Sequence, residues 1–252
     1  MLERLPTRAE REPVVGAGLG GDDTTAIDQA AEEAILARVR EAAGAVVSEE
    51  VGRVGGAGLP LLVVDPIDGS LNAKRGIPFF SLSIAVAEGE TMDDVVFGFV
   101  HDFGSREEWT ARRGEGAWLD GESLGAVRPK DEVEILSFEA TLTSLVARDA
   151  QKVAELAYRL RIMGSLALSL CHLAAGRVDA VCSLKPARSV DIAAAQLLCR
   201  ELGLAVDLFD VEKPFGAAPL DLEQRSRVVA AGSTPVCDRI AAALRTPLRS
   251  NE

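Results

Sequence analysis

The first half of the chain combines one helical pattern with many strand patterns. Apolar residues recur at helical spacing over 27–39, and the apolar runs 45–47 and 61–64 are typical of buried strands. Alternating segments separated by turn residues follow and predict an antiparallel meander. These segments are 81–87, 95–101, 107–112 and 114–118. The glycine-rich stretches 16–21 and 51–58 are expected to be loops.

The second half alternates strands with helices. Strands are predicted at 135–138, 179–184, 205–209 and 227–231. Helices are predicted at 144–160, 165–176, 190–202 and 235–244. This alternation is typical of an α/β unit. We therefore divide the chain into an α+β half, residues 1–125, and an α/β half, residues 126–252, which together form one compact unit.

The apolar run 61–64 leads directly into a turn that carries two carboxylates. Asp65 and Asp68 are three residues apart, and Pro66 fixes the backbone between them. Both side chains and the carbonyl of Ile67 can therefore point at one place, in the all-oxygen arrangement that hard divalent cations prefer. The alternative is that both acids are ordinary turn and helix-capping residues.

Two predicted helix starts are candidate phosphate sites. Gly69 and Ser70 open a short helix after the acidic turn, and Gly164 and Ser165 open a longer one in the second half. Unpaired amides at a helix N-terminus favour an anion. For Ser165, a plain helix cap is the alternative.

Three further acids occupy comparable positions. Glu49, followed by Glu50, comes directly after the strand at 45–47, and solvated acids are the alternative there. Asp28 lies in the first turn of the first helix, three residues after Thr25, a spacing that also fits a structural capping box. Asp191 begins an alanine-rich helix, where an N-cap is the alternative.

The composition is that of a soluble globular protein. The chain has 252 residues, of which 48% are hydrophobic and 26% charged. No apolar stretch is long enough to span a membrane, and residues 1–13 lack an apolar signal core. We expect a cytoplasmic protein with no membrane contact.

Charge and cysteine content narrow the function further. The net charge of −12 argues against a nucleic-acid surface. It would also repel a phosphorylated substrate, unless a bound cation such as Mg²⁺ reverses the local charge. The four cysteines lack metal-ligand spacing and are expected to be buried thiols in a reducing compartment. With two histidines, a histidine-rich metal site is not expected.

Taken together, these elements resemble the inositol monophosphatase superfamily of Mg²⁺-dependent, lithium-sensitive phosphatases. The matching elements, in the order of the family, are Asp22-x-x-Thr25-x-x-Asp28, Ser48-Glu49-Glu50, Asp65-Pro66-Ile67-Asp68-Gly69-Ser70, Gly164-Ser165 and Asp191-Ile192-Ala193-Ala194. The segments 76–80 and Arg188-x-x-Asp191 are similar to the archaeal-type branch, which hydrolyses both inositol monophosphate and fructose 1,6-bisphosphate. The resemblance implies a layered αβαβα sandwich and a homodimer.

The resemblance also implies a metal site. Glu49, Asp65 and the carbonyl of Ile67 would hold one Mg²⁺, and Asp65, Asp68 and Asp191 would hold a second. A third, weaker ion would lie near Glu49. Two or three ions at one site suit the in-line displacement of a phosphoryl group, because they stabilise both the attacking and the leaving oxygen.

The remaining roles follow from the same resemblance. Asp28 and Ser70 match the pair that orients the attacking water, with Glu49 as a further catalytic residue. The phosphate would contact Asp68, Gly69 and Ser70, and the second helix start would contribute Gly164 and Ser165.

Some positions depart from the pattern of the family. Leu184 stands where the inositol-specific branch has a Glu, and Leu166 replaces a small residue. The neighbouring Lys185 and Arg188 favour a substrate with a second phosphate or another anion. Solvated loop charges are the alternative for both. The polar segment before Gly16 is shorter than the N-terminal helix usual in the family.

We therefore predict a Mg²⁺-dependent phosphomonoester hydrolase that acts on small sugar or polyol phosphates. One alternative is an adenosine 3′,5′-bisphosphate nucleotidase with the same metal core. The other is a non-catalytic regulatory protein of the same fold, because fold alone does not fix function.

Overall fold

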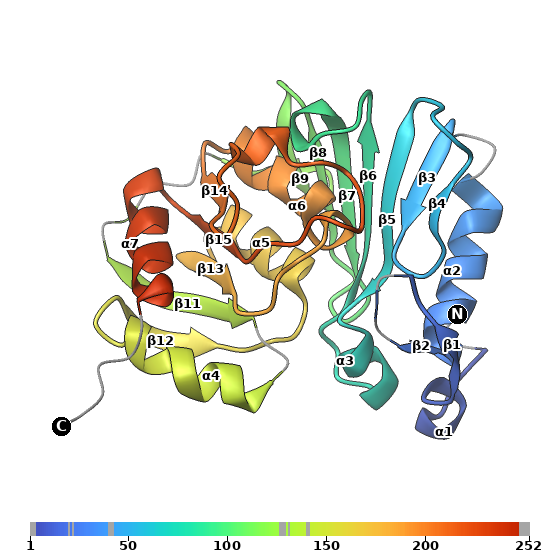
Figure 1. Ribbon diagram of the computed structural model, residues 1–252, viewed down its shortest axis with the longest axis horizontal. Helices are drawn as coiled ribbons and strands as arrows, with labels where there is room; N and C mark the ends of the chain where they lie inside the picture. Colours follow the sequence, from blue (N-terminus) through green and yellow to red (C-terminus); the bar gives the residue numbers. More distant parts are fainter. Residues whose placement is uncertain are drawn as a thin grey trace.

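Two large sheets form the framework of the computed structural model (Figure 1). The structure describes residues 4–246, apart from 20, 22, 40–42, 126–129, 131 and 140–141. The predicted boundary between residues 125 and 126, and Asp22 of the first matching element, therefore involve positions outside the described residues. Among the described residues, no helix has the length and apolar character to cross a membrane.

The first large sheet has eight strands in the order β10-β9-β8-β7-β6-β5-β3-β4. Its strands are β3 (Ala45–Ser48), β4 (Gly52–Val54), β5 (Leu61–Asp68), β6 (Ser81–Ala87), β7 (Val95–Asp102), β8 (Glu108–Arg112), β9 (Gly116–Leu119) and β10 (Glu122–Ser123). From β5 to β10 each strand pairs antiparallel with the next, which confirms the predicted meander. Strands β3 and β5 pair parallel, so that their carboxyl ends lie at the same edge.

The second large sheet has five strands in the order β12-β11-β13-β15-β14. Its strands are β11 (Val133–Glu139), β12 (Ala157–Arg161), β13 (Ala180–Ser183), β14 (Ala205–Leu208) and β15 (Val228–Ala231). A separate pair, β1 (Val14–Ala17) and β2 (Asp23–Thr25), lies near the N-terminus.

The helices cover both sheets in layers (Figure 1). They are α1 (Arg8–Arg11), α2 (Ala26–Val39), α3 (Ser70–Arg75), α4 (Thr143–Asp149), α5 (Leu166–Ala174), α6 (Ser189–Glu201) and α7 (Thr234–Arg245), with 3₁₀ turns η1 (Met92–Asp94), η2 (Ala150–Val153) and η3 (Phe215–Ala217). Helix α2 packs on the outer face of the eight-stranded sheet, α5 and α6 lie between the two sheets, and α4 and α7 lie on the far side of the five-stranded sheet. This is the predicted αβαβα sandwich.

Small side chains bring the middle helix layer close to the eight-stranded sheet. Strand β6 turns Ser81, Ser83, Ala85 and Ala87 inward, and all four are buried. At Gly98 in β7, a Cβ atom would lie 2.5 Å from the carbonyl oxygen of Ala194 in α6. Helix α6 can approach this closely because the sheet has no bulky side chain at that point.

Three local predictions were wrong. The predicted helix 144–160 ends at Asp149, and after η2 the chain forms strand β12, which pairs parallel with β11. The backbone pairing available at that sheet edge outweighs the local helix propensity of the segment. In the predicted loop 51–58, residues Gly52–Val54 form β4 against β3. The glycine-rich 16–21 stretch likewise contributes its first two residues to β1.

Candidate active site

A bulge at the end of β5 presents the predicted acidic turn. Asp65 pairs with Ser83 of β6 and Asp68 pairs with Ser81, so that three residue steps in β5 match two in β6. Such a bulge redirects side chains at the end of a strand. Oδ1 of Asp65 accepts a hydrogen bond from the amide of Ile67 at 3.0 Å, and Asp65 is 1% exposed. Burial, then the nearby carboxylates, raise the pKa of Asp65 well above its usual value.

The parallel pairing of β3 and β5 brings Glu49 to the same edge. Ser48 pairs with Val64, so that Glu49 and Asp65 are the next residues along the two strands. Burial raises the pKa of the Glu49 carboxyl to about 7, and the charges of Asp191 and Glu50 add to that effect. The chain thus holds several carboxylates close together at a site where charge is poorly solvated.

Helix α6 supplies a fourth acid together with a cation. The amide of Arg188 donates to Oδ2 of Asp191 at 2.7 Å, and its guanidinium Nη2 donates to Oδ1 at 2.9 Å. Its Nη1 lies 2.7 Å from Oε1 of Glu49. Arg188, predicted to bind substrate, therefore bridges two of the predicted metal ligands and partly neutralises them.

Asp68 is held by the N-terminus of α5. Its Oδ2 accepts hydrogen bonds from Oγ of Ser165 at 2.6 Å and from the amide of Ala167 at 2.7 Å. Burial raises the pKa of Asp68 to about 7, although the Ser165 hydrogen bond opposes the shift. The anion at the predicted Gly164–Ser165 site is thus a carboxylate of the protein itself.

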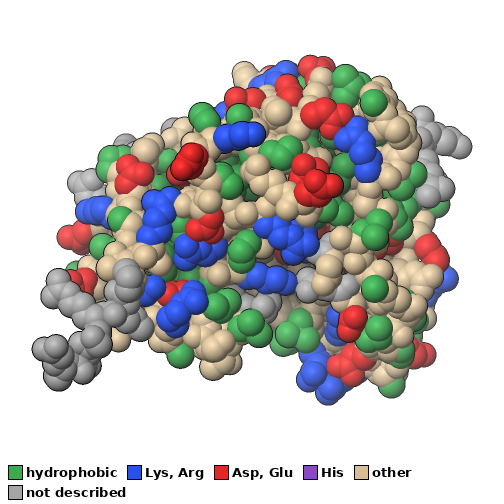
Figure 2. Space-filling model, in the orientation of Figure 1, with side chains coloured by type: hydrophobic (Ala, Val, Ile, Leu, Met, Phe, Trp, Pro, Cys, Tyr) green, Lys and Arg blue, Asp and Glu red, His purple; other side chains and the backbone are tan. Residues whose placement is uncertain are grey.

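One pocket of about 180 Å³ joins these elements. Its lining includes most of the predicted site residues: Glu49, Asp65, Asp68, Gly69, Ser70, Gly164, Lys185, Arg188 and Asp191. The acids come from both sheets and their connecting helices. In the view of Figure 2, Lys and Arg side chains gather over the C-terminal half and toward the middle of the face, despite the net charge of −12.

Three predicted residues do not line this pocket. The Ser165 hydroxyl is buried against Asp68, as described above. The Ile67 side chain is buried in a cluster with Ile27. Asp28 accepts a hydrogen bond from the amide of Thr25 at 3.0 Å, and its carboxylate lies 3.6 Å from Nζ of Lys74. The capping geometry considered for Asp28 is therefore present.

Sequence analysis missed three residues at the site. Glu139 and Arg225 both line the pocket. Asn72 of α3 donates hydrogen bonds to the carbonyls of Phe79 and Met163, at 2.8 and 2.7 Å. The sequence does contain a signal for Glu139, because an acid directly after an apolar strand was the pattern used to find Asp65. Arg225 and Asn72 lie in segments without such a pattern.

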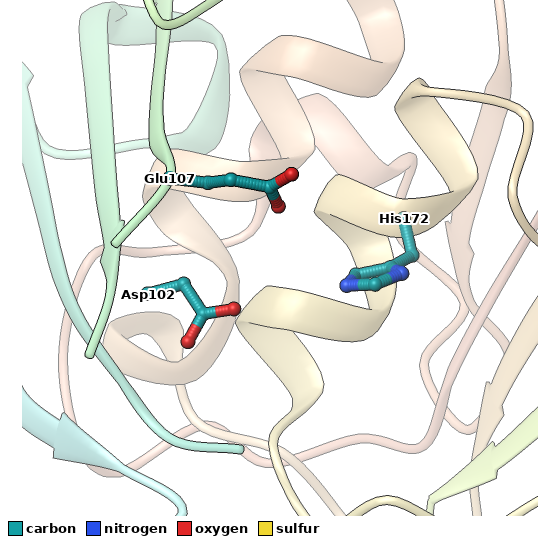
Figure 3. Close-up of side chains that lie close together, drawn as sticks. All are labelled: Asp102, Glu107 and His172. Atoms are coloured by element: carbon teal, nitrogen blue, oxygen red, sulfur yellow. The ribbon is translucent and has the colours of Figure 1, made fainter. Parts of the chain in front are cut away.

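A second cluster of potential metal ligands lies elsewhere. Among the described residues, Asp102, Glu107 and His172 offer ligand atoms within 4.8 Å of one another, and Figure 3 shows them facing a common space. The carboxylates already have partners: Asp102 accepts from the amide of Gly104, and Glu107 binds Arg177 through both oxygens. The five acids that line the pocket form no such group in the described part of the chain, and Arg188 lies between two of them, Glu49 and Asp191.

Comparisons with known proteins agree with this geometry. The model of the inositol monophosphatase family matches residues 7–248. A fructose-1,6-bisphosphatase/inositol-1-monophosphatase of Thermococcus kodakarensis is 36% identical over 190 residues, which are 75% of this chain and 71% of the relative. The protein of the same name from Methanocaldococcus jannaschii is 30% identical over 235 residues, 92% and 89% of the two chains. A crystal structure of an inositol monophosphatase-fructose 1,6-bisphosphatase superposes with a TM-score of 0.84 at 28% identity, covering 97% of this chain and 93% of that one.

Proposed function

The chain belongs to the inositol monophosphatase family, and from that membership we propose that it is a Mg²⁺-dependent phosphatase of small sugar and polyol phosphates. Inositol 1-phosphate and fructose 1,6-bisphosphate are the proposed substrates, since the relatives described above carry both activities in their names. The observation that carries the proposal is the single pocket lined by Glu49, Asp65, Asp68 and Asp191.

The side chains of this pocket fit hard divalent cations. All of its acidic side chains offer oxygen atoms, which hard cations prefer. Five carboxylates, including Glu139, line the pocket against three cations, so that acids outnumber basic groups. We infer that Glu49, Asp65 and the carbonyl of Ile67 would hold one Mg²⁺, and Asp65, Asp68 and Asp191 a second. The chemistry supplied by Mg²⁺ at such a site is neutralisation of phosphate charge and a lower pKa for the attacking water.

The phosphate is proposed to bind at the turn between β5 and α3. Gly69 has a φ of 92°, and a Cβ atom there would lie 2.9 Å from the carbonyl oxygen of Gly164. Only glycine fits this close contact between the two halves, which leaves the amides of Gly69 and Ser70 beside the pocket. Ser70, Asp28 and Glu49 are proposed to orient the water, and the position of Ser70 in the pocket lining supports its part.

Lys185 is the proposed contact for a second anionic group on the substrate. Lys185 lines the pocket, whereas the preceding Leu184 is buried in the core and its side chain cannot accept hydrogen bonds from a sugar hydroxyl. Arg188 is proposed to have two roles, because its guanidinium already neutralises Glu49 and Asp191. A cation held between two acids can still attract a phosphate, but with less net charge.

We further propose that the enzyme is a cytoplasmic homodimer. The four free, buried cysteines are consistent with a reducing compartment. Tyr158 and Ile162, 76% and 48% exposed beside the edge strand β12, are apolar groups that a second copy could cover. Light scattering of the purified protein tests the dimer directly.

A substrate panel tests the proposed function. Phosphate release should be measured for inositol 1-phosphate, fructose 1,6-bisphosphate and adenosine 3′,5′-bisphosphate, with Mg²⁺ and with a chelator. We expect release from the first two with Mg²⁺ only, and inhibition by lithium as the family implies. Release from the adenosine compound alone would identify a nucleotidase, and no release from any compound would favour a non-catalytic role.

A further inference from the structure

Strand β11 ends in a buried carboxylate to which no role has yet been given. Glu139 is 6% exposed and lines the pocket, close enough to Asp68 for the two charges to repel. Its hydrogen-bond partners are neutral donors: the hydroxyls of Ser137 and Ser169, at 2.9 and 2.7 Å, and the amides of Gly164 and Met163, at 2.8 and 3.4 Å. Burying a carboxylate without a cationic partner costs folding free energy, which argues that Glu139 has a specific role.

The amide bound by Glu139 belongs to the turn that leads into α5. Gly164 has a φ of 90°, and the next residue, Ser165, donates its hydroxyl to Asp68. From the other half of the molecule, Asn72 donates to the carbonyl of Met163 in the same turn. The turn is therefore held from both sides, by Glu139 on the five-stranded sheet and by Asn72 on α3.

We propose that Glu139 is a positioning residue: it fixes the 163–165 turn so that Ser165 and the amide of Ala167 hold Asp68 in its metal-binding orientation. This inference rests on the proposed function, because it assumes that Asp68 binds an ion. The geometry behind it is the continuous chain of hydrogen bonds from Glu139 through Gly164 and Ser165 to Asp68. Residues that orient a metal ligand typically change affinity without touching the ion.

Two substitutions distinguish positioning from a purely electrostatic effect. Glu139→Ala removes every hydrogen bond that Glu139 makes with the turn and leaves the bond from Asn72 to Met163 in place. Glu139→Gln can keep the 2.8 Å bond to the turn, since its carbonyl oxygen can accept from the Gly164 amide while its NH₂ donates to the Ser137 and Ser169 hydroxyls, which can rotate to accept. Only the longer contact from the Met163 amide, at 3.4 Å, loses its acceptor. If Glu139 acts by positioning, glutamine rescues the alanine variant. If its charge were what mattered, both variants would behave alike.

The readout is the affinity for Mn²⁺, measured by electron paramagnetic resonance on the folded full-length protein with Mg²⁺ as competitor. We expect Glu139→Ala to weaken binding about ten- to a hundredfold and Glu139→Gln to stay within about threefold of the wild type. Asp149→Asn is the matched control. This variant neutralises another buried carboxylate, which is paired with Arg148 of α4 and Lys152 of η2. It should lower thermal stability without changing Mn²⁺ affinity.

Each outcome bears on the proposal. A folded Glu139→Ala variant that binds Mn²⁺ like the wild type overturns it, and so does a Glu139→Gln variant that loses as much affinity as Glu139→Ala. If the wild type itself binds no Mn²⁺ and hydrolyses no phosphomonoester, the proposed function fails as well. If the wild type binds and hydrolyses while the alanine variant is unaffected, only the role of Glu139 is lost.

Discussion

The two large sheets, with their loops and helices, contribute different charges to one pocket: the first contributes acids alone, and the second contributes all the cations in the lining. The eight-stranded sheet and its turns supply Glu49, Asp65 and Asp68, whereas the loops around the five-stranded sheet supply Lys185, Arg188 and Arg225. Asp191 and Glu139 are exceptions, since both are acids of the pocket that lie in the second half. The difference suggests a division of labour in which the first sheet performs the chemistry common to all phosphomonoesters and the second selects among substrates.

The two sets of residues are also held differently. The acids lie at strand ends whose register is fixed by backbone pairing, as for Glu49 beside Asp65. The cations lie on two loops joined by a short bridge, in which the amide of Ala187 donates to the carbonyl of Ser226 at 2.7 Å. Loops change more readily than strand ends, so that substrate selection can vary while the metal site is kept.

The largest effect is expected from Asp65→Asn. Loss of an acid proposed to touch both ions should lower Mg²⁺-dependent phosphate release by at least about 100-fold, because metal-assisted stabilisation amounts to several kcal/mol. Burial already disfavours the charged form of Asp65, so the metal-free variant should melt no lower than the wild type. Ser83→Ala, opposite Asp65 in β6, serves as the control. Full turnover by Asp65→Asn would break the assignment of chemistry to the first sheet.

A smaller effect is expected where α6 touches the eight-stranded sheet. Gly98→Ala places a methyl group against the carbonyl of Ala194, and the helix must shift, at a cost of about 1–3 kcal/mol. Because Asp191 lies in the first turn of that helix, we expect about tenfold weaker Mg²⁺ binding as well. Gly125→Ala is the control, since a Cβ atom there meets open space. Melting curves and Mg²⁺ titrations of the two variants would show whether stability and metal affinity depend on this contact between α6 and the eight-stranded sheet.

The sequence predicted the inner strands of both sheets and missed strands at their edges, β4 and β10 in the first and β12 in the second. The Asp65 turn, the meander and the acid after β3 all follow apolar runs with clear ends, and local pattern is enough to find them. It was not enough for β12, because the edge of β11 that pairs with it lies in a separate segment of the chain. The sequence also could not show that β3 and β5 pair parallel, although this pairing is what places Glu49 beside Asp65.

Side-chain partners at the site were harder to predict than the site residues themselves. Ser165 was expected to contact a phosphate, but in the structure its hydroxyl donates a hydrogen bond to the carboxylate of Asp68. Arg188 was expected to contact substrate, and it bridges Glu49 and Asp191. Ser165 and Asp68 are 97 positions apart, and Arg188 and Glu49 lie in different halves of the chain, so that no spacing in the sequence encodes these two contacts. The contact of Arg188 with Asp191 is local, three residues along the chain.

The third prediction sharpens the role given to the second sheet. Lys185→Ala should lower kcat/KM for fructose 1,6-bisphosphate about tenfold, since a charge-assisted contact to the second phosphate is lost. Inositol 1-phosphate has no second phosphate, and its kcat/KM should change by about twofold at most. Lys213→Ala removes an exposed lysine between β14 and η3 that does not line the pocket, and it controls for net charge. An equal loss for both substrates would show that Lys185 does not select between them.

The smallest effect expected is a pH-dependent stabilisation by Mg²⁺. Glu49 faces Arg188, Asp191 and Glu50, while Asp68 faces Asp191 and Glu139, and burial raises the pKa of both to about 7. In the metal-free protein, protonation of these two carboxyl groups stabilises the fold. That stabilisation is complete below the ordinary pKa of each carboxyl group and is lost as the pH rises through about 7. Mg²⁺ requires the deprotonated acids, so its stabilising effect grows over the same range.

Melting temperatures should therefore fall between about pH 6 and about pH 8 in chelator, and saturating Mg²⁺ should raise them by a few degrees more at the higher pH. If Mg²⁺ raised the melting temperature equally at both pH values, the buried acids of the first sheet would not be ligands of the metal.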